Sequence, residues 1–341
     1  MKTLLTLLIS FFSFAATAQI PEPAMLWLRE YGGNGDDQVE PFVTKTQDKG
    51  FISCINSNSA YGTGNIDSFC SMSDSRNIFI KYNSDAGVVE WTKCFTDGHI
   101  YMYPIDSGNF IFGGQGYGAA WEFFIEKTDS VGDNFWRKTY GGEAASALLR
   151  GMMPTNDGGY IMFGIVYYTD TDFTTHYGMY GADMGVLKVD SNGNKVWSKV
   201  IGGTGDDEAA AIVPAPGAGC YIVGYTTSGN YDCTGNHGGS DAYVARLDSN
   251  GNILWHNDLG GSNNDGGGGT NAYPDGNGGV IIATISGSDD GDVSHQIDTG
   301  GFDIWAIDVD SNNHILWNNC YGGGGMKFQM LFAKQWMAVY G

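Results

Sequence analysis

The stretch GNHGGSDAYVARLDSNGNILWHNDLGG, residues 235–261, contains the pattern that decides the fold. Residues 242–248 alternate between two faces as a β-strand does, and the tight turn SNGN at 249–252 joins them to a following strand. Two further short strands precede this stretch, joined by a turn whose glycines can take positive φ. The unit that ends near Trp255 is therefore predicted to have four strands, at residues 209–215, 220–226, 242–248 and 253–258.

The same marks recur along the chain in a fixed phase. A tryptophan is followed five and six residues later by Gly-Gly, and an aspartate lies fourteen residues before several of these tryptophans, as Asp241 does before Trp255. A second motif, NDGGYI at 156–161, recurs in variant form. Such self-similarity is the signature of a repeat architecture. The marked tryptophans are Trp27, Trp136, Trp197, Trp255 and Trp317, with a degenerate copy at Trp91.

Four-stranded units repeated radially describe a β-propeller, which leaves few free sheet edges. We therefore expect an all-β fold, a β-propeller of four-stranded blades with five complete blades and an incomplete closing blade. A solenoid is the alternative, but its coils are usually shorter and do not need three hairpins per unit. The extra length of each unit falls mostly between its second and third strands, so one face of the disc should carry long polar loops, where binding usually resides. These loops are residues 57–76, 167–182, 228–240 and 286–301.

Both ends of the array are expected to contribute to the closing blade. A lone fourth-strand copy surrounds Trp27, and FQMLFAKQ at 328–335 can serve as a first strand. The codons for Trp336 to Val339, read two bases later, can encode Asp-Gly-Gly, which belongs to the second motif of the repeat. Our hypothesis is that this tail is a frameshifted or prematurely ended copy of the repeat and that the domain is C-terminally truncated. The five complete units close at Trp91, Trp136, Trp197, Trp255 and Trp317.

The first eighteen residues read as a signal peptide, and residues 19–341 as a single β-propeller domain. Lys2 gives the leader a positive start, an apolar stretch follows, and residues 16–18 are a small-residue cleavage site. The formal net charge is −21, or −22 once Lys2 leaves with the leader. Such a surface repels nucleic acid and anionic lipid, and no later segment is long and apolar enough to span a bilayer. We expect a secreted or cell-surface protein with no nucleic-acid partner and no membrane insertion.

Six cysteines in an exported chain make disulfides possible. Cys54 and Cys70 lie in one repeat unit, and Cys220 and Cys233 lie in another. Two local pairs are therefore predicted, although spacing alone leaves other connectivities open. Cys94 and Cys320 are left over.

The motifs DGGYI and GNHGGSDAYVARLDSNGNILWHNDLGG, in register with the Trp and Gly-Gly marks, resemble the propeller repeats of secreted Bacteroidota proteins. The resemblance covers residues 25–325. It implies a β-propeller in the cell envelope or outside the cell, and it implies no shared catalytic residues. Many proteins of that family carry a C-terminal sorting domain for the type IX secretion route. That domain is absent here, which leaves the later export route open.

Carboxylates in glycine-rich loops are the candidate metal ligands, because Ca²⁺ prefers oxygen ligands. Asp37, Asp207 and Asp265 each lie four residues past a Gly-Gly, and their recurrence favours hydrogen bonding to backbone N–H groups in a turn. The denser clusters DTD and DDGD are the candidate Ca²⁺ loops, although neither continues into an EF-hand. Their residues are Asp170, Asp172, Asp289, Asp290 and Asp292. No other cofactor is predicted.

Side chains of the long loops are the candidate ligand contacts, whereas the strand tryptophans keep phase with Gly-Gly and are expected to pack between blades. His176, His237 and His295 occur in equivalent loops of successive blades, so they are expected to stand too far apart to share a metal ion. The tyrosines predicted to contact a ligand are Tyr167, Tyr168, Tyr177, Tyr180 and Tyr231.

No nucleophile elbow or regular metal-binding motif indicates an enzyme. The main hypothesis is a secreted, non-catalytic β-propeller that acts as a binding or scaffold module for a glycan or another envelope protein. A polysaccharide-degrading enzyme, either a lyase or a glycosidase, on a propeller scaffold is one alternative. A structural segment of a larger adhesin is another. Fold does not fix function, so the sequence names neither the ligand nor the oligomeric state.

Overall fold

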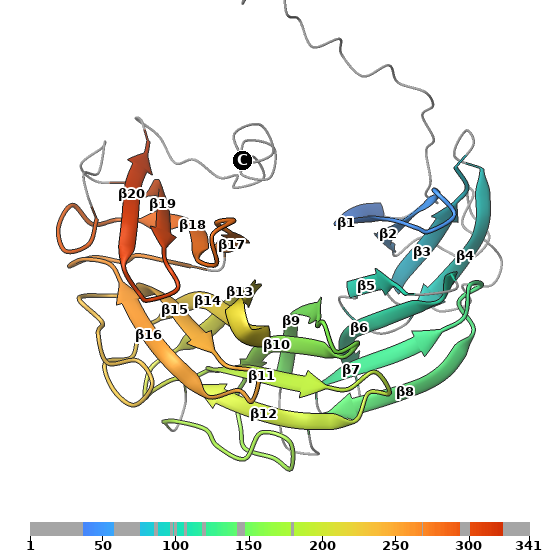
Figure 1. The fold of residues 1–341 in the computed structure, drawn as a ribbon, viewed down its shortest axis with the longest axis horizontal. Coiled ribbons are helices and arrows are strands. Elements are labelled where there is room, and N and C mark those ends of the chain that lie inside the picture. The colour runs from blue at the N-terminus through green and yellow to red at the C-terminus, as the bar shows by residue number, and fades with distance from the viewer. Residues whose placement is uncertain are drawn as a thin grey trace, which may run out of the picture.

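A computed structural model of the chain confirms the all-β prediction and the four-stranded unit. Each strand of the described part belongs to one of five four-stranded sheets, in which consecutive strands are antiparallel neighbours. Figure 1 shows these sheets side by side in chain order as propeller blades, with the first strands toward the centre and the fourth strands outside. The structure describes residues 37–57, 76–84, 88–95, 98, 101–105, 108–117, 121–141, 147–178, 181–267, 269–293 and 301–322.

The five sheets are called blades 1 to 5 in chain order. Blade 1 consists of β1 (Asp37–Lys45), β2 (Phe51–Ser57), β3 (Arg76–Tyr82) and β4 (Val89–Phe95). Blade 2 consists of β5 (Tyr101–Pro104), β6 (Phe110–Tyr117), β7 (Trp121–Thr128) and β8 (Asn134–Tyr140). Blade 3 consists of β9 (Ala147–Pro154), β10 (Tyr160–Val166), β11 (Asp183–Val189) and β12 (Lys195–Ile201). Blade 4 consists of β13 (Asp207–Ala215), β14 (Gly219–Thr226), β15 (Asp241–Leu247) and β16 (Ile253–Leu259). Blade 5 consists of β17 (Asn271–Pro274), β18 (Val280–Ser286), β19 (Asp303–Val309) and β20 (Ile315–Tyr321).

The SNGN turn between β15 and β16 forms where the sequence predicts it. The Asp248 carboxylate accepts hydrogen bonds from the backbone N–H groups of Asn250 and Asn252, at 2.8 and 2.9 Å. Gly251 takes a φ of +82°, which a residue with a Cβ rarely adopts. The turn is therefore specified locally, and it fixes the register of the two strands that it joins.

The core lies in the seams between neighbouring blades. Because side chains on a strand alternate between two faces, each sheet gives one face to the seam before it and the other to the seam after it. Between blades 3 and 4 the seam buries Phe163, Val186, Ile222 and Tyr243, among others. Between blades 4 and 5 it buries Tyr221, Val223, Ala242, Val244, Ile282 and Trp305, among others.

The fourth-strand tryptophans of blades 1 to 4 pack between blades, as the sequence predicts, whereas Trp317 of blade 5 is 39% exposed. The Trp197 indole N–H donates to the Ser249 carbonyl in the β15–β16 turn of the next blade, at 2.9 Å. Its ring lies so close to Gly251 that a Cβ there would stand 2.7 Å away. Trp91 and Trp255 make the same indole hydrogen bond to the next blade, to Ser130 and Ser311.

The disulfide prediction is wrong at both proposed pairs. Cys54, Cys220 and Cys233 are buried thiols, and so is Cys320. Cys54 and Cys220 lie on strands whose side chains point into seam cores, and burial raises the pKa of the Cys220 thiol to about 12. Cys94, which the sequence leaves over, is disulfide-bonded, and its partner lies outside the described residues.

Several predictions fall outside the part of the chain that the structure describes. The closing blade, with the copy at Trp27 and the strand at 328–335, is one of them, and so are the leader and the C-terminal tail. Among the described residues, no helix is long and apolar enough to cross a membrane.

Candidate functional site

Two of the aspartates that follow Gly-Gly tie the start of blades 4 and 5 to the long loops of these blades. The Asp207 carboxylate is fully buried and accepts hydrogen bonds from Gly203 N, at 2.6 Å, and from the hydroxyl groups of Thr226 and Ser228. Asp265 has the same set of donors one blade later: Gly261 N at 2.7 Å, Ser286 and Ser288. The prediction that these carboxylates bond turn N–H groups is confirmed for Asp207 and Asp265. The side chain of Asp37 lies outside the described residues.

A second buried aspartate faces the first across a glycine. Asp183 and Asp207 both lie against Gly202, where a Cβ would stand 2.0 Å from Asp183 Oδ1 and 2.9 Å from Asp207 Oδ2. Burial raises the pKa of Asp183 to about 7, and the charge of Asp207 contributes. Oδ1 of Asp183 has no hydrogen-bond partner among the described residues, whereas Oδ2 accepts from Tyr177 N at 2.6 Å. The first glycine of the repeat motif is thus required because two carboxylates crowd its Cα.

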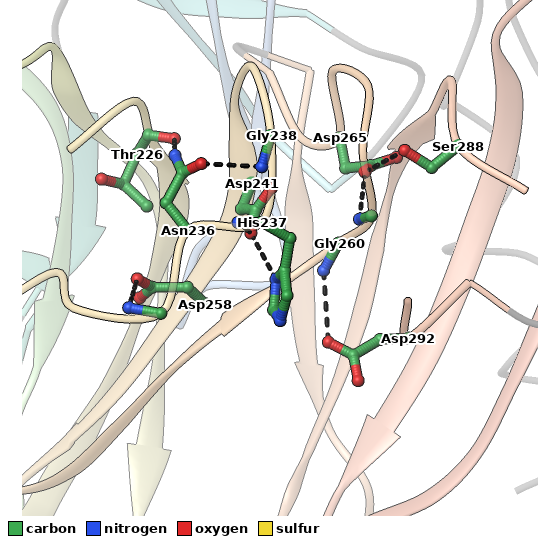
Figure 2. Close-up of polar contacts among 12 residues, drawn as sticks. Thr226, Asn236, His237, Gly238, Asp241, Asp258, Gly260, Asp265, Ser288 and Asp292 are labelled. Atoms are coloured by element: carbon green, nitrogen blue, oxygen red, sulfur yellow. Dashed lines mark hydrogen bonds and ion pairs between the residues drawn. The ribbon is translucent and has the colours of Figure 1, made fainter. Parts of the chain in front are cut away.

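The next seam repeats this arrangement, and in both seams a histidine lies near the first aspartate: His176 Nε2 is 3.6 Å from Asp183 Oδ2. Figure 2 shows His237 beside Asp241, whose Oδ2 accepts from the His237 backbone N–H at 2.8 Å and lies 2.7 Å from Nδ1. A Cβ on Gly260 would stand 2.6 Å from Asp241 Oδ1 and 2.9 Å from Asp265 Oδ2. Burial lowers the pKa of His237, but the hydrogen bond and charge of Asp241 outweigh it and raise the pKa overall. Recurrence in two seams indicates that these carboxylates have a structural role at the links between blades.

The candidate Ca²⁺ residues are engaged with their own surroundings and form two separate groups. Asp172 accepts from Gly141 N and pairs with Lys195 at 2.7 Å, while the Asp170 carboxylate accepts from the backbone N–H groups of residues 172 and 173. Asp290 accepts from Ser262 N at 2.7 Å, and Asp292 accepts from Gly260 N at 3.3 Å (Figure 2). Asp289 is exposed. The described part of the chain assembles no group of three acidic, histidine or cysteine side chains suited to a metal, and calcium binding stays a prediction.

The loop tyrosines are brought together in part. Tyr177 of blade 3 and Tyr231 of blade 4 stack with ring centroids 4.9 Å apart, although they are far apart in sequence. Tyr168, which is 55% exposed, stacks on His176 at 6.4 Å. Burial and the nearby charge of Glu208 raise the pKa of Tyr167, and the charge of Arg150 opposes them. Tyr180 lies outside the described residues, as does His295.

Tyr231 is held in an unusual backbone conformation. Its φ is +55°, in the left-handed region that bulky side chains avoid, and it lies in a tight turn in which Cys233 N donates to Asn230 O at 3.0 Å. The side chain is 63% exposed, so core packing does not account for its identity. Such strain costs on the order of 1–3 kcal/mol and is typical of functional positions.

Polar groups lie next to the stacked tyrosines. The Tyr177 hydroxyl lies beside Asp232, and burial together with that carboxylate raises the pKa of Tyr177 to about 12. Lys199 Nζ lies 3.6 Å from Asp232 Oδ2, an oxygen that accepts no hydrogen bond from the described residues. Sequence reasoning did not find Lys199 or Asp232. No local signal could have, because β12 and the loop of the next blade meet only after folding.

Comparison with known proteins gives no family. No protein-family model and no curated protein matches the chain. Solved structures do match at low identity. The Dos1 propeller has 12% identity and a TM-score of 0.45, covering 86% of this chain and 74% of its own. A eukaryotic initiation factor has 9% identity and a TM-score of 0.41, covering 86% of this chain.

A third similar structure is a GH43 β-xylosidase/α-arabinofuranosidase from a compost microbial metagenome, with 12% identity and a TM-score of 0.37, covering 84% of this chain and 94% of its own. The chain spans 56% of the length of the initiation factor. The class of the protein therefore follows from its own five sheets, which make it a β-propeller.

Proposed function

We propose that the chain is an exported, non-catalytic binding module that holds a glycan against Tyr231. The observation that carries the proposal is a strained, 63% exposed tyrosine that stacks on a second tyrosine from the neighbouring blade. An aromatic ring with one free face and a polar neighbour suits the apolar face of a sugar ring and its hydroxyl groups. Asp232 and Lys199 are the polar neighbours.

The local charge favours a neutral glycan over an acidic one. Asp183 and Asp232 lie near the hydroxyl of Tyr177, and the whole chain has a net charge of −21. A uronate-rich polymer would be repelled by this surface at low ionic strength. Asp232 Oδ2 is buried beside Lys199, so the polar contact to a sugar hydroxyl group is expected from the ammonium group of Lys199, whose side chain is 32% exposed.

The non-catalytic part of the proposal rests on the recurrence of the buried carboxylates at equivalent positions in successive blades. Asp207 and Asp265 take the same donors in successive blades, and Asp183 and Asp241 take equivalent places beside a glycine. A catalytic pair is needed once, whereas a seam is built between every two blades. Their repetition therefore supports a structural role.

A glycan array, probed with and without Ca²⁺, tests the proposal. Neutral glycans identified there should bind about tenfold or more weakly to Tyr231→Gly, because the stacking face is lost. The same variant should unfold at an equal or higher free energy, because glycine accepts positive φ without strain. Phe135→Ala, which removes another exposed aromatic ring, is the matched control and should bind as the wild type does.

Three outcomes would count against the proposal. Cleavage of a polysaccharide would contradict the non-catalytic role. Absence of glycan binding would leave an envelope protein as the ligand class. Equal loss in Tyr231→Gly and Phe135→Ala would remove the assignment to Tyr231.

A further inference from the structure

Asparagine followed by glycine is prone to deamidation, because glycine offers its backbone nitrogen to the asparagine side chain without hindrance from a Cβ. The described residues contain three such pairs, each in the turn of a hairpin: Asn192–Gly193, Asn250–Gly251 and Asn277–Gly278. All three asparagines are exposed, so access to water does not distinguish them. The difference between the pairs lies in the glycine.

Two of the three glycines have a backbone nitrogen that is already engaged. Gly251 N donates to Asp248 O at 3.1 Å, and the Trp197 ring of the preceding blade lies against this glycine. A hydrogen bond of 3.0 Å and a tryptophan ring hold Gly193 in the same way. Reaction at either nitrogen therefore requires the turn to open and the ring to move.

The backbone N–H of Gly278 makes no hydrogen bond to any residue that the structure describes. Matching strand registers place Gly278 where the β9–β10 turn of blade 3 has Gly158, whose N–H donates to Thr155 O at 3.0 Å. Gly276 takes a φ of +84°, whereas its counterpart Asn156 has no positive φ. The chain thus follows another path through the blade 5 turn and leaves the nitrogen of Gly278 unengaged.

The side chain of Asn277 is equally unengaged, although its backbone is held. The Asp275 carboxylate accepts hydrogen bonds from Asn277 N at 2.7 Å and from Gly279 N at 2.8 Å. In the described part of the chain, the amide group of Asn277 has no hydrogen-bond partner. The side-chain amide can therefore rotate toward the following nitrogen without breaking a contact.

We propose that Asn277 is a site of spontaneous deamidation in which the backbone nitrogen of Gly278 is the nucleophile. This nitrogen loses its proton to hydroxide and attacks Cγ of Asn277. The Cγ–Nδ2 bond breaks, and ammonia leaves with a proton from water. Water then opens the cyclic succinimide at either carbonyl, which yields aspartate or isoaspartate. The net change replaces an amide by a carboxylate and consumes only water.

Both products are expected to loosen the seam between blades 4 and 5. Gly278 O accepts a hydrogen bond from the Tyr221 hydroxyl of blade 4 at 2.7 Å. Isoaspartate adds a CH₂ group to the main chain directly before Gly278, so this carbonyl is displaced. Aspartate adds a charge where blades 1 and 3 pair an aspartate with a buried lysine, but blade 5 has Asp308 in place of that lysine.

Peptide mapping of the folded full chain, after incubation in mildly alkaline buffer, tests the proposal. Mass spectrometry detects the new carboxylate, and an isoaspartyl methyltransferase labels the isoaspartate. Asn277 should deamidate about tenfold faster than Asn192 and Asn250, because no hydrogen bond of the following N–H has to break first. In denaturant the three sites should react at similar rates. Equal rates in the folded chain, or a difference that persists in denaturant, would overturn the proposal.

Two variants test the cause and the consequence. Gly276→Asn gives the turn the residue of blade 3 and should slow deamidation of Asn277 about tenfold, because residue 278 regains its hydrogen bond. Asn277→Asp should speed hydrogen exchange in β14 and β18 about tenfold, whereas the control Asn250→Asp should leave both strands at the wild-type rate. An unchanged rate of deamidation in Gly276→Asn would contradict the role of the unengaged nitrogen. Equal exchange in the two aspartate variants would contradict the effect on the seam.

Discussion

A single glycine shows how the repeat is specified at the residue scale. Gly251 has a φ of +82° and lies against the Trp197 ring of the preceding blade, so it meets two requirements at once. Gly217 meets only the first, because its φ is +78° and nothing lies within 4 Å of a Cβ placed there. The two glycines therefore separate backbone strain from seam packing.

Replacing each glycine by alanine measures the two effects. Gly217→Ala should lower the free energy of unfolding by about 1 kcal/mol through strain alone. Gly251→Ala should lower it by about 3 kcal/mol, because the new methyl group also displaces the Trp197 ring. Chemical denaturation gives both values. Equal losses of unfolding free energy in the two variants would mean that the contact between Trp197 and the turn adds nothing to stability.

At the scale of the element, the Asp183–Asp207 pair beside Gly202 is expected to make the free energy of unfolding depend on pH. The pKa of Asp183 is raised to about 7 from an ordinary value of 3.8, so the folded state holds a proton that the unfolded chain releases between these values. The free energy of unfolding gained from this group is largest below about pH 4 and falls as the pH rises toward 7. The full change is on the order of 2–4 kcal/mol.

The variant Asp183→Asn should remove this dependence. It should unfold at a higher free energy than the wild type at pH 8 and show a flatter profile between pH 4 and pH 7, measured by denaturation at each pH. Asp248→Asn is the control, since hydrogen bonds from Asn252 lower the pKa of Asp248 and its replacement cannot flatten the profile in this way. If Asp183→Asn kept the wild-type change in the free energy of unfolding between pH 4 and pH 7, another group would be responsible for that change.

Much of each element could be predicted from the sequence, because its determinants are local. Alternation set the strands, and turn residues such as Asp248 and Gly251 set the hairpins. Phase with Gly-Gly placed the tryptophans in the seams. The pairing of Asp183 with Asp207 and the stacking of Tyr177 on Tyr231 could not be predicted, because each joins two blades whose relative placement depends on the whole seam.

The cysteines show a prediction from sequence spacing that the structure contradicts. Proximity in sequence suggested that Cys220 and Cys233 form a disulfide, and both do lie in the core of one seam. They remain thiols, and Cys233 lies beside Asp207 and Thr226. Nearness along a chain limits the length of a loop but not the direction in which two side chains point.

At the scale of the whole molecule, blades pack mainly against their immediate neighbours, so stability should be divided seam by seam. A protein of this kind behaves approximately as a one-dimensional array, with a term for each unit and a term for each interface. Losses in one seam should spread little to a distant one.

Hydrogen exchange tests this division. Trp255→Ala removes the indole from the seam between blades 4 and 5 and should lower protection in β14, β15, β18 and β19, by about 3 kcal/mol of opening free energy. Protection in blade 2 should stay at its wild-type level. A uniform drop across all blades would instead indicate a single cooperative unit.

The seam also has a consequence for how such a chain can change over generations. Each blade contributes the tryptophan of one seam and the turn of the other, and the joint between blades is a short glycine-containing link such as residues 202–206. Recombination within two such links would add or remove a whole blade and leave both new seams made of matching halves. Such an exchange would change the number of blades, while each seam kept the same pattern of tryptophan and turn.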